Sequence, residues 1–414
     1  MPQNKLVDHL FRHQYGKMVS ILTRVFGLAH LETIEDAVQD TFITAMRVWP
    51  GNMPENPEAW LTQASKNRAL DLFRKIGAEH KRAPQLETGP STIALKELFL
   101  DSEIADSQLR MIFAACNPLL NPKDQIAFAL KTISGFSQKE IAAALLLKEE
   151  TIKKRLSRAR SVISSSGISF EIPTGKELPN RLSRVLEVIY LIFNDGFHST
   201  KKEALVREDL CGEALRLCQM LLSNPLTSHP NTQALLALMC FQAARLKSKI
   251  NDQNELISLK KQDRSKWYAP LMSMGHIAMT RAVETESFSS YHYEAAIAAE
   301  HTSAKDYEST DWAKILMWYE RLEEVQPSPF NILNRAVIHL QIEEYEQAKN
   351  LLEQVNAQAL EQRAYLYHGL WAEYFYKTGH KDQALDKVEK AIALVSNTSE
   401  KAYLLQKKRK YEAH

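Results

Sequence analysis

Two short helices joined by a tight turn are predicted by the stretches Gly135-Phe136-Ser137-Gln138-Lys139-Glu140-Ile141-Ala142 and Glu149-Glu150-Thr151-Ile152-Lys153-Lys154-Arg155-Leu156-Ser157-Arg158-Ala159-Arg160. The second helix has two faces, because apolar and polar residues each recur at the α-helical period. This is the pattern of a helix-turn-helix. The apolar face consists of Ile152, Leu156, Ala159 and Ile163, and the polar face of Thr151, Lys154, Arg155 and Arg158.

The second helix is a candidate for reading DNA in the major groove. Such a helix needs hydrogen-bond donors for base edges and phosphates, and its polar face supplies them. A basic helix on its own is more often a solvated surface. The preceding helix over 137–144 and the turn Leu145-Leu146-Leu147 favour DNA binding over that alternative.

Composition narrows the class of protein. The chain has 414 residues, of which 45% are hydrophobic and 25% charged, with a net charge of +2. These values are typical of a globular protein with two or three domains. No apolar run approaches the roughly 20 residues of a membrane span, and no signal peptide is apparent, so we expect a cytoplasmic protein. The four cysteines lack Cys-x-x-Cys spacing and the histidines are scattered, so we expect no metal site and no cofactor.

The pattern is helical throughout, which predicts an all-α fold. Low glycine content, 13 residues, agrees with this. Near the C-terminus the pair Ala336 and Ala348 and the pair Ala372 and Ala384 repeat with an offset of 36 residues, close to the roughly 34-residue period of tetratricopeptide helix pairs. The predicted organisation is a helical domain over 5–76, a linker over 77–103, a second helical domain over 104–166, a linker over 167–180 and a helical extension over 181–414.

A second basic helix follows a proline-rich loop. The loop spans 50–57, and the helix runs from about Glu58 to Lys75 with basic residues along it. Its aromatic residues could belong to a core and its basic residues to a solvated face. Two basic helical units in one chain, separated by a linker, favour nucleic-acid binding.

Together these residues resemble the bacterial sigma-70 family, in the two-domain extracytoplasmic-function type. The resemblance lies in Asp36-Ala37-Val38-Gln39-Asp40-Thr41-Phe42, in Ala59-Trp60-Leu61 with Lys66-Asn67-Arg68-Ala69-Leu70-Asp71, and in the helix-turn-helix. The remainder is similar to the subgroup with a C-terminal tetratricopeptide-like extension. That likeness includes Val188–Phe197, where Asp195-Gly196-Phe197 replaces the more usual Glu-Gly-Tyr.

The resemblance implies partners and site residues. The partners are promoter DNA and core RNA polymerase, through its β′ clamp helices and β flap. Residues similar to the polymerase-binding helix are Asp36, Gln39, Asp40 and Phe42. Residues expected at the −10 element are Asn52, Asn56, Lys66, Asn67, Arg68 and Arg74. Residues expected at the −35 element are Thr151, Lys153, Lys154, Arg155 and Arg158.

The element Asn194, Asp195, Gly196 and Phe197 has two interpretations. Gly196 could simply permit a turn after a buried helix. Alternatively, these residues form a regulatory loop that relays the state of the extension. The repeat domain is in addition a candidate docking surface for a protein partner.

The sequence therefore predicts an alternative sigma factor that directs core polymerase to promoters and is regulated through its helical extension. One alternative is a helix-turn-helix regulator with a repeat scaffold that acts without polymerase. Another is a pure interaction scaffold. An enzyme is not expected, because no catalytic set or phosphate loop stands out.

Overall fold

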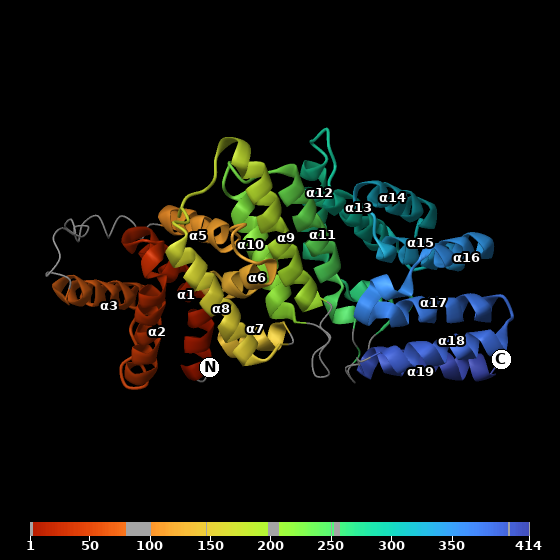
Figure 1. Ribbon diagram of the computed structural model, residues 1–414, viewed down its shortest axis with the longest axis horizontal. Coiled ribbons are helices and arrows are strands. Elements are labelled where there is room, and N and C mark those ends of the chain that lie inside the picture. The colour runs from red at the N-terminus through yellow and green to blue at the C-terminus, as the bar shows by residue number, and fades with distance from the viewer. Residues whose placement is uncertain are drawn as a thin grey trace. The chain divides into compact units, whose positions relative to one another are not determined.

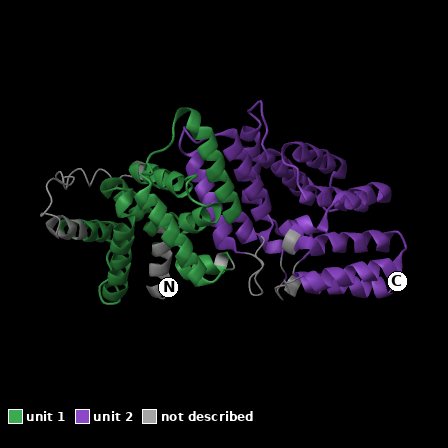
Figure 2. Ribbon diagram, in the orientation of Figure 1, with its two compact units in different colours: residues 1–192 green, residues 193–414 purple. Residues whose placement is uncertain are grey.

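The computed structural model describes residues 3–79, 101–145, 147–197, 207–249, 251, 257–395 and 398–413. Within these ranges all regular structure is helical, which confirms the predicted all-α fold. The chain divides into two compact units, residues 1–192 and residues 193–414 (Figure 1 and Figure 2).

The first unit begins with a bundle of three helices, called here the first bundle. Its core forms because apolar residues of α2 recur on one face, as Ile34, Val38 and Phe42, which are at most 2% exposed. The loop before α3 is held by Trp49 and Trp60, whose ring centroids lie 5.5 Å apart. The helices of the first bundle are α1 (Gln3–Phe26), α2 (Leu31–Val48) and α3 (Pro57–Glu79), with a 3-10 turn at Leu28–His30.

The second bundle contains the predicted helix-turn-helix. Its first helix is fixed by a capping box at Ser137, whose Oγ accepts from Glu140 N at 3.1 Å while Ser137 N donates to the Glu140 carboxylate at 2.8 Å. The predicted apolar face of the second helix is at most 4% exposed. The helices of the second bundle are α5 (Asp101–Ala115), α6 (Pro122–Thr132), α7 (Gln138–Ala144) and α8 (Glu149–Ser165).

Helix α9 (Leu178–Phe197) follows a 3-10 turn at Gly175–Glu177 and packs on the second bundle. Arg181 Nη2 donates to the Phe113 carbonyl oxygen at 2.6 Å, and Arg184 Nε donates to Gln125 Oε1 at 2.9 Å. The start of the predicted extension is therefore structurally part of the first unit. Most of the predicted linker over 77–103 lies outside the described residues.

The second unit consists of helices that pair in succession along the chain. The small residues of the predicted repeat, Ala336 with Ala348 and Ala372 with Ala384, are fully buried and lie on the successive helices of two pairs, α15 with α16 and α17 with α18. This confirms the predicted helix pairs. The helices are α10 (Glu208–Leu222), α11 (Pro230–Ala244), α12 (Ala269–Ala282), α13 (Ser290–Ser303), α14 (Trp312–Val325), α15 (Pro329–Gln341), α16 (Tyr345–Gln354), α17 (Ala364–Lys377), α18 (Lys381–Leu394) and α19 (Thr398–Ala413).

No helix in the described ranges is long and apolar enough to cross a membrane. Among the same residues, no group of three or more His, Cys, Asp and Glu side chains is placed to hold a metal ion.

Candidate nucleic-acid interface

Two lysines dominate the outer face of α8, the second helix of the helix-turn-helix. Lys153 and Lys154 are exposed, and the Lys154 ammonium lies 3.9 Å from a Glu150 carboxylate oxygen, a distance that leaves it solvated. Thr151 lies one turn earlier and is half-buried. This surface offers mobile positive charge of the kind that pairs with phosphates.

Two of the arginines of α8, Arg155 and Arg158, are held in place by α6. Arg158 makes a bidentate ion pair with Asp124, with Nε at 3.1 Å and Nη2 at 2.8 Å, and this contact raises the pKa of Arg158. Arg155 Nη1 donates to the Lys123 carbonyl oxygen at 3.4 Å. The Arg158 side chain is still 62% exposed, so its unused N–H groups stay open to a further acceptor.

The residues expected at the −10 element lie mostly on an exposed surface of the first bundle. Asn52 and Asn56 are exposed in the loop before α3, and Asn56 Oδ1 accepts from Ala59 N at 3.0 Å. Asn67 is exposed and accepts from Gln63 Nε2 at 2.9 Å. The loop asparagines and Asn67 thus place amide groups at the surface, where unpaired bases could reach them.

Three basic residues of α3 differ in exposure. Arg74 is exposed, and Arg68 is exposed but makes an ion pair with Asp40 at 2.6 Å. Lys66 is only 3% exposed, because it neighbours the buried face of α3 that includes Ser65 and Ala69. The Lys66 side chain is therefore withdrawn from solvent in this conformation, and its contact with DNA stays a prediction.

The residues of α2 that are predicted to bind polymerase differ in their exposure to solvent. Asp36 is exposed, and Gln39 and Asp40 are half-buried. Phe42 is 2% exposed, because it continues the core period of α2, and its contact with polymerase stays a prediction. Sequence reasoning missed the apolar side chains that are exposed instead, Ile43 at 48% and Met46 at 46%. The sequence feature that could have identified Ile43 and Met46 is that they are apolar but do not follow the helical spacing of the buried residues of α2.

A buried ion pair joins α2 of the first bundle to α8 of the second. The Glu35 side chain is 1% exposed and accepts from Arg160, with Nη2 at 2.5 Å and Nε at 3.1 Å. Tyr15 Oη donates to the other Glu35 oxygen at 3.2 Å. A buried carboxylate needs such partners, because it is costly to desolvate alone.

Close packing supports the same junction between the two bundles. A Cβ at Gly16 of α1 would lie 1.9 Å from the carbonyl oxygen of Ile133, at the end of α6, so only glycine allows this approach. Lys131 Nζ lies 5.0 Å from the ring centroid of Tyr15, and burial lowers the pKa of that lysine. Beside the junction is a cleft of about 550 Å³ lined by residues of both bundles, Asp36 and Gln39 among them.

The predicted regulatory loop is not a loop. Asn194, Asp195, Gly196 and Phe197 form the last turn of α9. A Cβ at Gly196 would lie 2.8 to 2.9 Å from atoms of Arg207, Leu210 and Cys211, so the glycine is required for close packing of α10 against α9.

The last residue of α9 is enclosed by basic side chains. Lys249 Nζ donates to the Phe197 carbonyl oxygen at 2.5 Å and lies 3.5 Å from the centroid of its ring. Burial lowers the pKa of Lys249 to about 7. Burial raises the pKa of Asp195 to about 6. These groups make the end of α9 a tightly packed point of the second unit.

Comparison with known proteins agrees with this arrangement. Residues 10–79 match the family model of sigma-70 region 2, and residues 110–162 match that of sigma-70 region 4. Residues 181–283 match a family of unknown function, DUF6596.

Relatives cover either the whole chain or its first part. An uncharacterized protein of Rhizobium meliloti is 33% identical over 382 residues, which are 91% of this chain and 89% of that protein. The ECF RNA polymerase sigma factor SigE of Mycolicibacterium smegmatis is 29% identical over 161 residues, 37% of this chain and 58% of that protein. The RNA polymerase sigma factor CnrH of Cupriavidus metallidurans is 28% identical over 160 residues, 37% of this chain and 82% of that protein. No solved structure matches this chain.

Two helical bundles, the second with a helix-turn-helix, define a DNA-binding protein of transcription initiation. The chain belongs to the sigma-70 family, as an extracytoplasmic-function sigma factor with a helical C-terminal extension. The first bundle is region 2 and the second bundle is region 4. As an alternative sigma factor it works with core RNA polymerase and promoter DNA, and the sigma family is not enzymatic.

Proposed function

We propose that this sigma factor reads its promoter through two separate surfaces. The outer face of α8 enters the major groove at the −35 element, with Lys153 and Lys154 on phosphates and Arg155 and Arg158 positioned by α6. The loop before α3 and the exposed face of α3 capture the unwound −10 strand. The exposed residues proposed for this second surface are Asn52, Asn56, Asn67, Arg68 and Arg74.

Core polymerase docks on α2 in this proposal. The acidic and amide groups of Asp36, Gln39 and Asp40 adjoin the exposed apolar side chains of Ile43 and Met46. Apolar side chains bordered by polar ones suit a protein interface. The β′ clamp helices are the proposed partner of this face, the β flap is the partner of region 4, and the protein acts in the cytoplasm.

The described conformation is closed, and binding opens it. Part of the α2 face lines the cleft shared with region 4, where Ser137 and Gln138 form the opposite wall. A polymerase subunit on this face would displace region 4 from α2 and break the ion pair of Glu35 with Arg160. The ion pair thus holds the free sigma factor in a state that polymerase must open.

The extension is needed for activity in this proposal, because its first helix completes region 4. Residues Val185, Leu186 and Ile189 of α9 are at most 1% exposed. A chain cut after 167 lacks this helix, whereas a chain cut after 197 keeps it. We expect the shorter chain to lose folded region 4, seen as lost hydrogen-exchange protection of α5 and α6. Full protection in the shorter chain would show that α9 is dispensable for region 4.

DNA binding with and without polymerase tests the proposal against a polymerase-independent regulator. The single observation that carries the sigma assignment is the pairing of region 2 with a region 4 whose helix α8 presents exposed lysines. We expect weak binding of a promoter duplex by the free protein and tight, sequence-specific binding once core polymerase is added. Tight specific binding that core polymerase does not change would favour the polymerase-independent regulator.

A further inference from the structure

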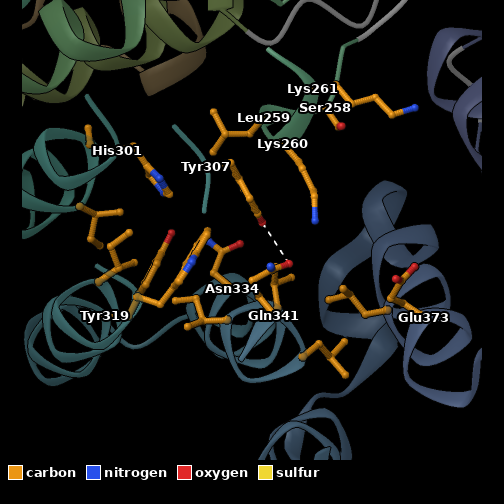
Figure 3. Close-up of a pocket in the computed structure, with 18 of the residues that line it drawn as sticks. Ser258, Leu259, Lys260, Lys261, His301, Tyr307, Tyr319, Asn334, Gln341 and Glu373 are labelled. Carbon is orange, nitrogen blue, oxygen red and sulfur yellow. Dashed lines mark hydrogen bonds between the residues drawn. The ribbon is translucent and has the colours of Figure 1, made fainter. Parts of the chain in front are cut away.

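The second unit contains a cavity of about 810 Å³ that the surfaces described above do not use. Its walls come from α11, α13, α14, α15, α17 and α19, together with the segment 258–261 (Figure 3). Its volume lies in the upper part of the range of ligand sites, about 300 to 1,000 Å³.

The cavity lining is strongly biased toward positive charge. Among the described residues, the acidic side chains of the lining are Glu294 and Glu373. Glu373 already accepts from Lys407 at 2.8 Å and from Tyr411 at 2.7 Å. A ligand that enters this space meets an excess of cations, which favours negative charge on the ligand. The basic residues of the lining are Arg245, Lys260, Lys261, Lys377, Lys407 and Lys410.

Among these cations Arg245 is half-buried, and burial lowers its pKa to about 10. No carboxylate of the described residues forms an ion pair with it, and its guanidinium lies 5.3 Å from the ring centroid of Phe197. At neutral pH it stays charged. Nearby His301 is neutral, because burial and then Arg245 lower its pKa to about 3. A partly buried cation without a carboxylate is an open position for an anionic group.

Side-chain amides in the lining point to the kind of anion. An amide offers both a donor and an acceptor, which matches the alternating N–H and C=O groups of a peptide backbone. Gln242 Oε1 is buried and has no hydrogen-bond partner, and neither has His301 Nδ1. An unpaired acceptor at Gln242 requires a donor, which a carboxylate alone does not supply. The amides of the lining are Gln242, Asn331, Asn334, Gln341 and Gln406.

Aromatic residues complete the lining. Phe241 lies on α11, and Trp312 and Tyr319 lie on α14. Tyr307 donates from its Oη to Gln341 Oε1 at 3.3 Å. Figure 3 shows five labelled side chains that line the cavity: His301 of α13, Tyr307 of the segment before α14, Tyr319 of α14, and Asn334 and Gln341 of α15. Such walls suit apolar side chains between charged ones.

We propose that this cavity binds an acidic, extended peptide segment of a partner protein. Its carboxylates pair with Arg245 and with the lysines, its backbone pairs with the amides, and its apolar side chains lie on the aromatic rings. A small organic anion would use the cations but leave the Gln242 acceptor without a donor. The peptide therefore accounts for more of the lining than the anion does.

Fluorescence anisotropy on the full-length protein tests this proposal without depending on transcription. The probe is the fluorescein-labelled peptide Asp-Glu-Leu-Asp-Phe-Glu-Asp-Glu, and its comparison peptide has lysine in place of every acidic residue. We expect micromolar binding of the acidic peptide only, weakened about tenfold in the double variant Lys260→Glu, Lys410→Glu. The matched control is Arg409→Glu, because Arg409 is exposed on α19 next to Lys410 and does not line the cavity.

A second variant separates backbone recognition from charge alone. Gln242→Leu removes the unpaired acceptor and keeps every cation, and we expect it to weaken the acidic peptide severalfold while the circular dichroism melt stays unchanged. Citrate is the small-anion probe, and we expect it to compete only weakly. The proposal is overturned if the acidic peptide fails to bind at about 1 mM, if Arg409→Glu weakens it as much as the double variant, or if citrate binds and the peptide does not.

Discussion

Arg160→Met should open the junction between regions 2 and 4. The substitution keeps an apolar side chain in the space of the arginine stem. It removes the two hydrogen bonds from Arg160 to the Glu35 carboxylate, which is 1% exposed, and leaves the one from Tyr15. Desolvated charge without a compensating cation is unfavourable, so the closed state loses stability relative to an open one in which water reaches Glu35.

The size of the effect follows from the burial of the two partners. Removing one partner of a buried ion pair costs about 3 to 5 kcal/mol. The Arg160 side chain is 23% exposed, so water screens part of the interaction and we expect a cost just below that range, about 2 to 3 kcal/mol. Since about 1.4 kcal/mol is a factor of ten, the open state should gain roughly 30- to 150-fold in relative population.

Hydrogen–deuterium exchange followed by mass spectrometry on the full-length chain measures this directly. We expect faster exchange in peptides from α2 and α8 of Arg160→Met, and unchanged exchange in Lys153→Met, which alters an exposed cation of the same helix. The double variant Glu35→Leu, Arg160→Leu should recover much of the protection, because it leaves no buried charge. Equal protection of α2 in Arg160→Met and Lys153→Met would refute the reasoning.

Three further predictions concern other parts of the chain. Lys154→Ala should lower the slope of log affinity against log salt by about one unit for promoter binding by the holoenzyme. The control Lys349→Ala, on α16, should leave this slope unchanged. An unaltered slope for Lys154→Ala would place that side chain away from phosphates. Gly196→Ala should lower the free energy of unfolding of the second unit by about 1 to 3 kcal/mol, since its Cβ would lie 2.8 Å from the carbonyl oxygen of the N-cap residue of α10. A Cβ at Gly212 would meet nothing within 4 Å, so Gly212→Ala should raise the free energy of unfolding slightly. Urea unfolding in which Gly196→Ala is the more stable of the two variants would contradict the close packing at Gly196. Burial raises the pKa of Asp195 to about 6, so the folded state binds the carboxyl proton more tightly than the unfolded state does. The free energy of unfolding should therefore fall as pH rises from about 4 to about 6. Asp195→Asn should remove this fall, which is measured as the urea midpoint across that pH range.

Local patterns made much of the fold predictable. The helix-turn-helix follows from the helical period of its apolar residues and from Ser137 with Glu140 three residues on, and the structure has that capping box. The helix pairs of the second unit follow from the spacing of Ala336 with Ala348, both fully buried. In each case, residues close in sequence determine the outcome.

The parts that sequence reasoning missed depend on contacts between distant residues. Glu35 and Arg160 are 125 positions apart, and nothing local distinguishes their charges from solvated ones. Lys66 and Phe42 match the family pattern, yet tertiary packing buries both. Gly196 of the predicted loop lies in the last turn of α9, where its missing side chain lets α10 approach closely. That approach is a tertiary contact, which the local sequence does not show.

Run-off transcription with purified core RNA polymerase tests the central claim most directly. The templates are fragments of the source genome, and the full-length protein is compared with the double variant Lys153→Ala, Lys154→Ala. We expect the full-length protein to produce new transcripts whose start sites share a pair of upstream elements, and the double variant to produce far less of the same transcripts. No new transcripts with the full-length protein, or transcripts whose start sites share no common elements, would contradict a promoter-specific sigma factor.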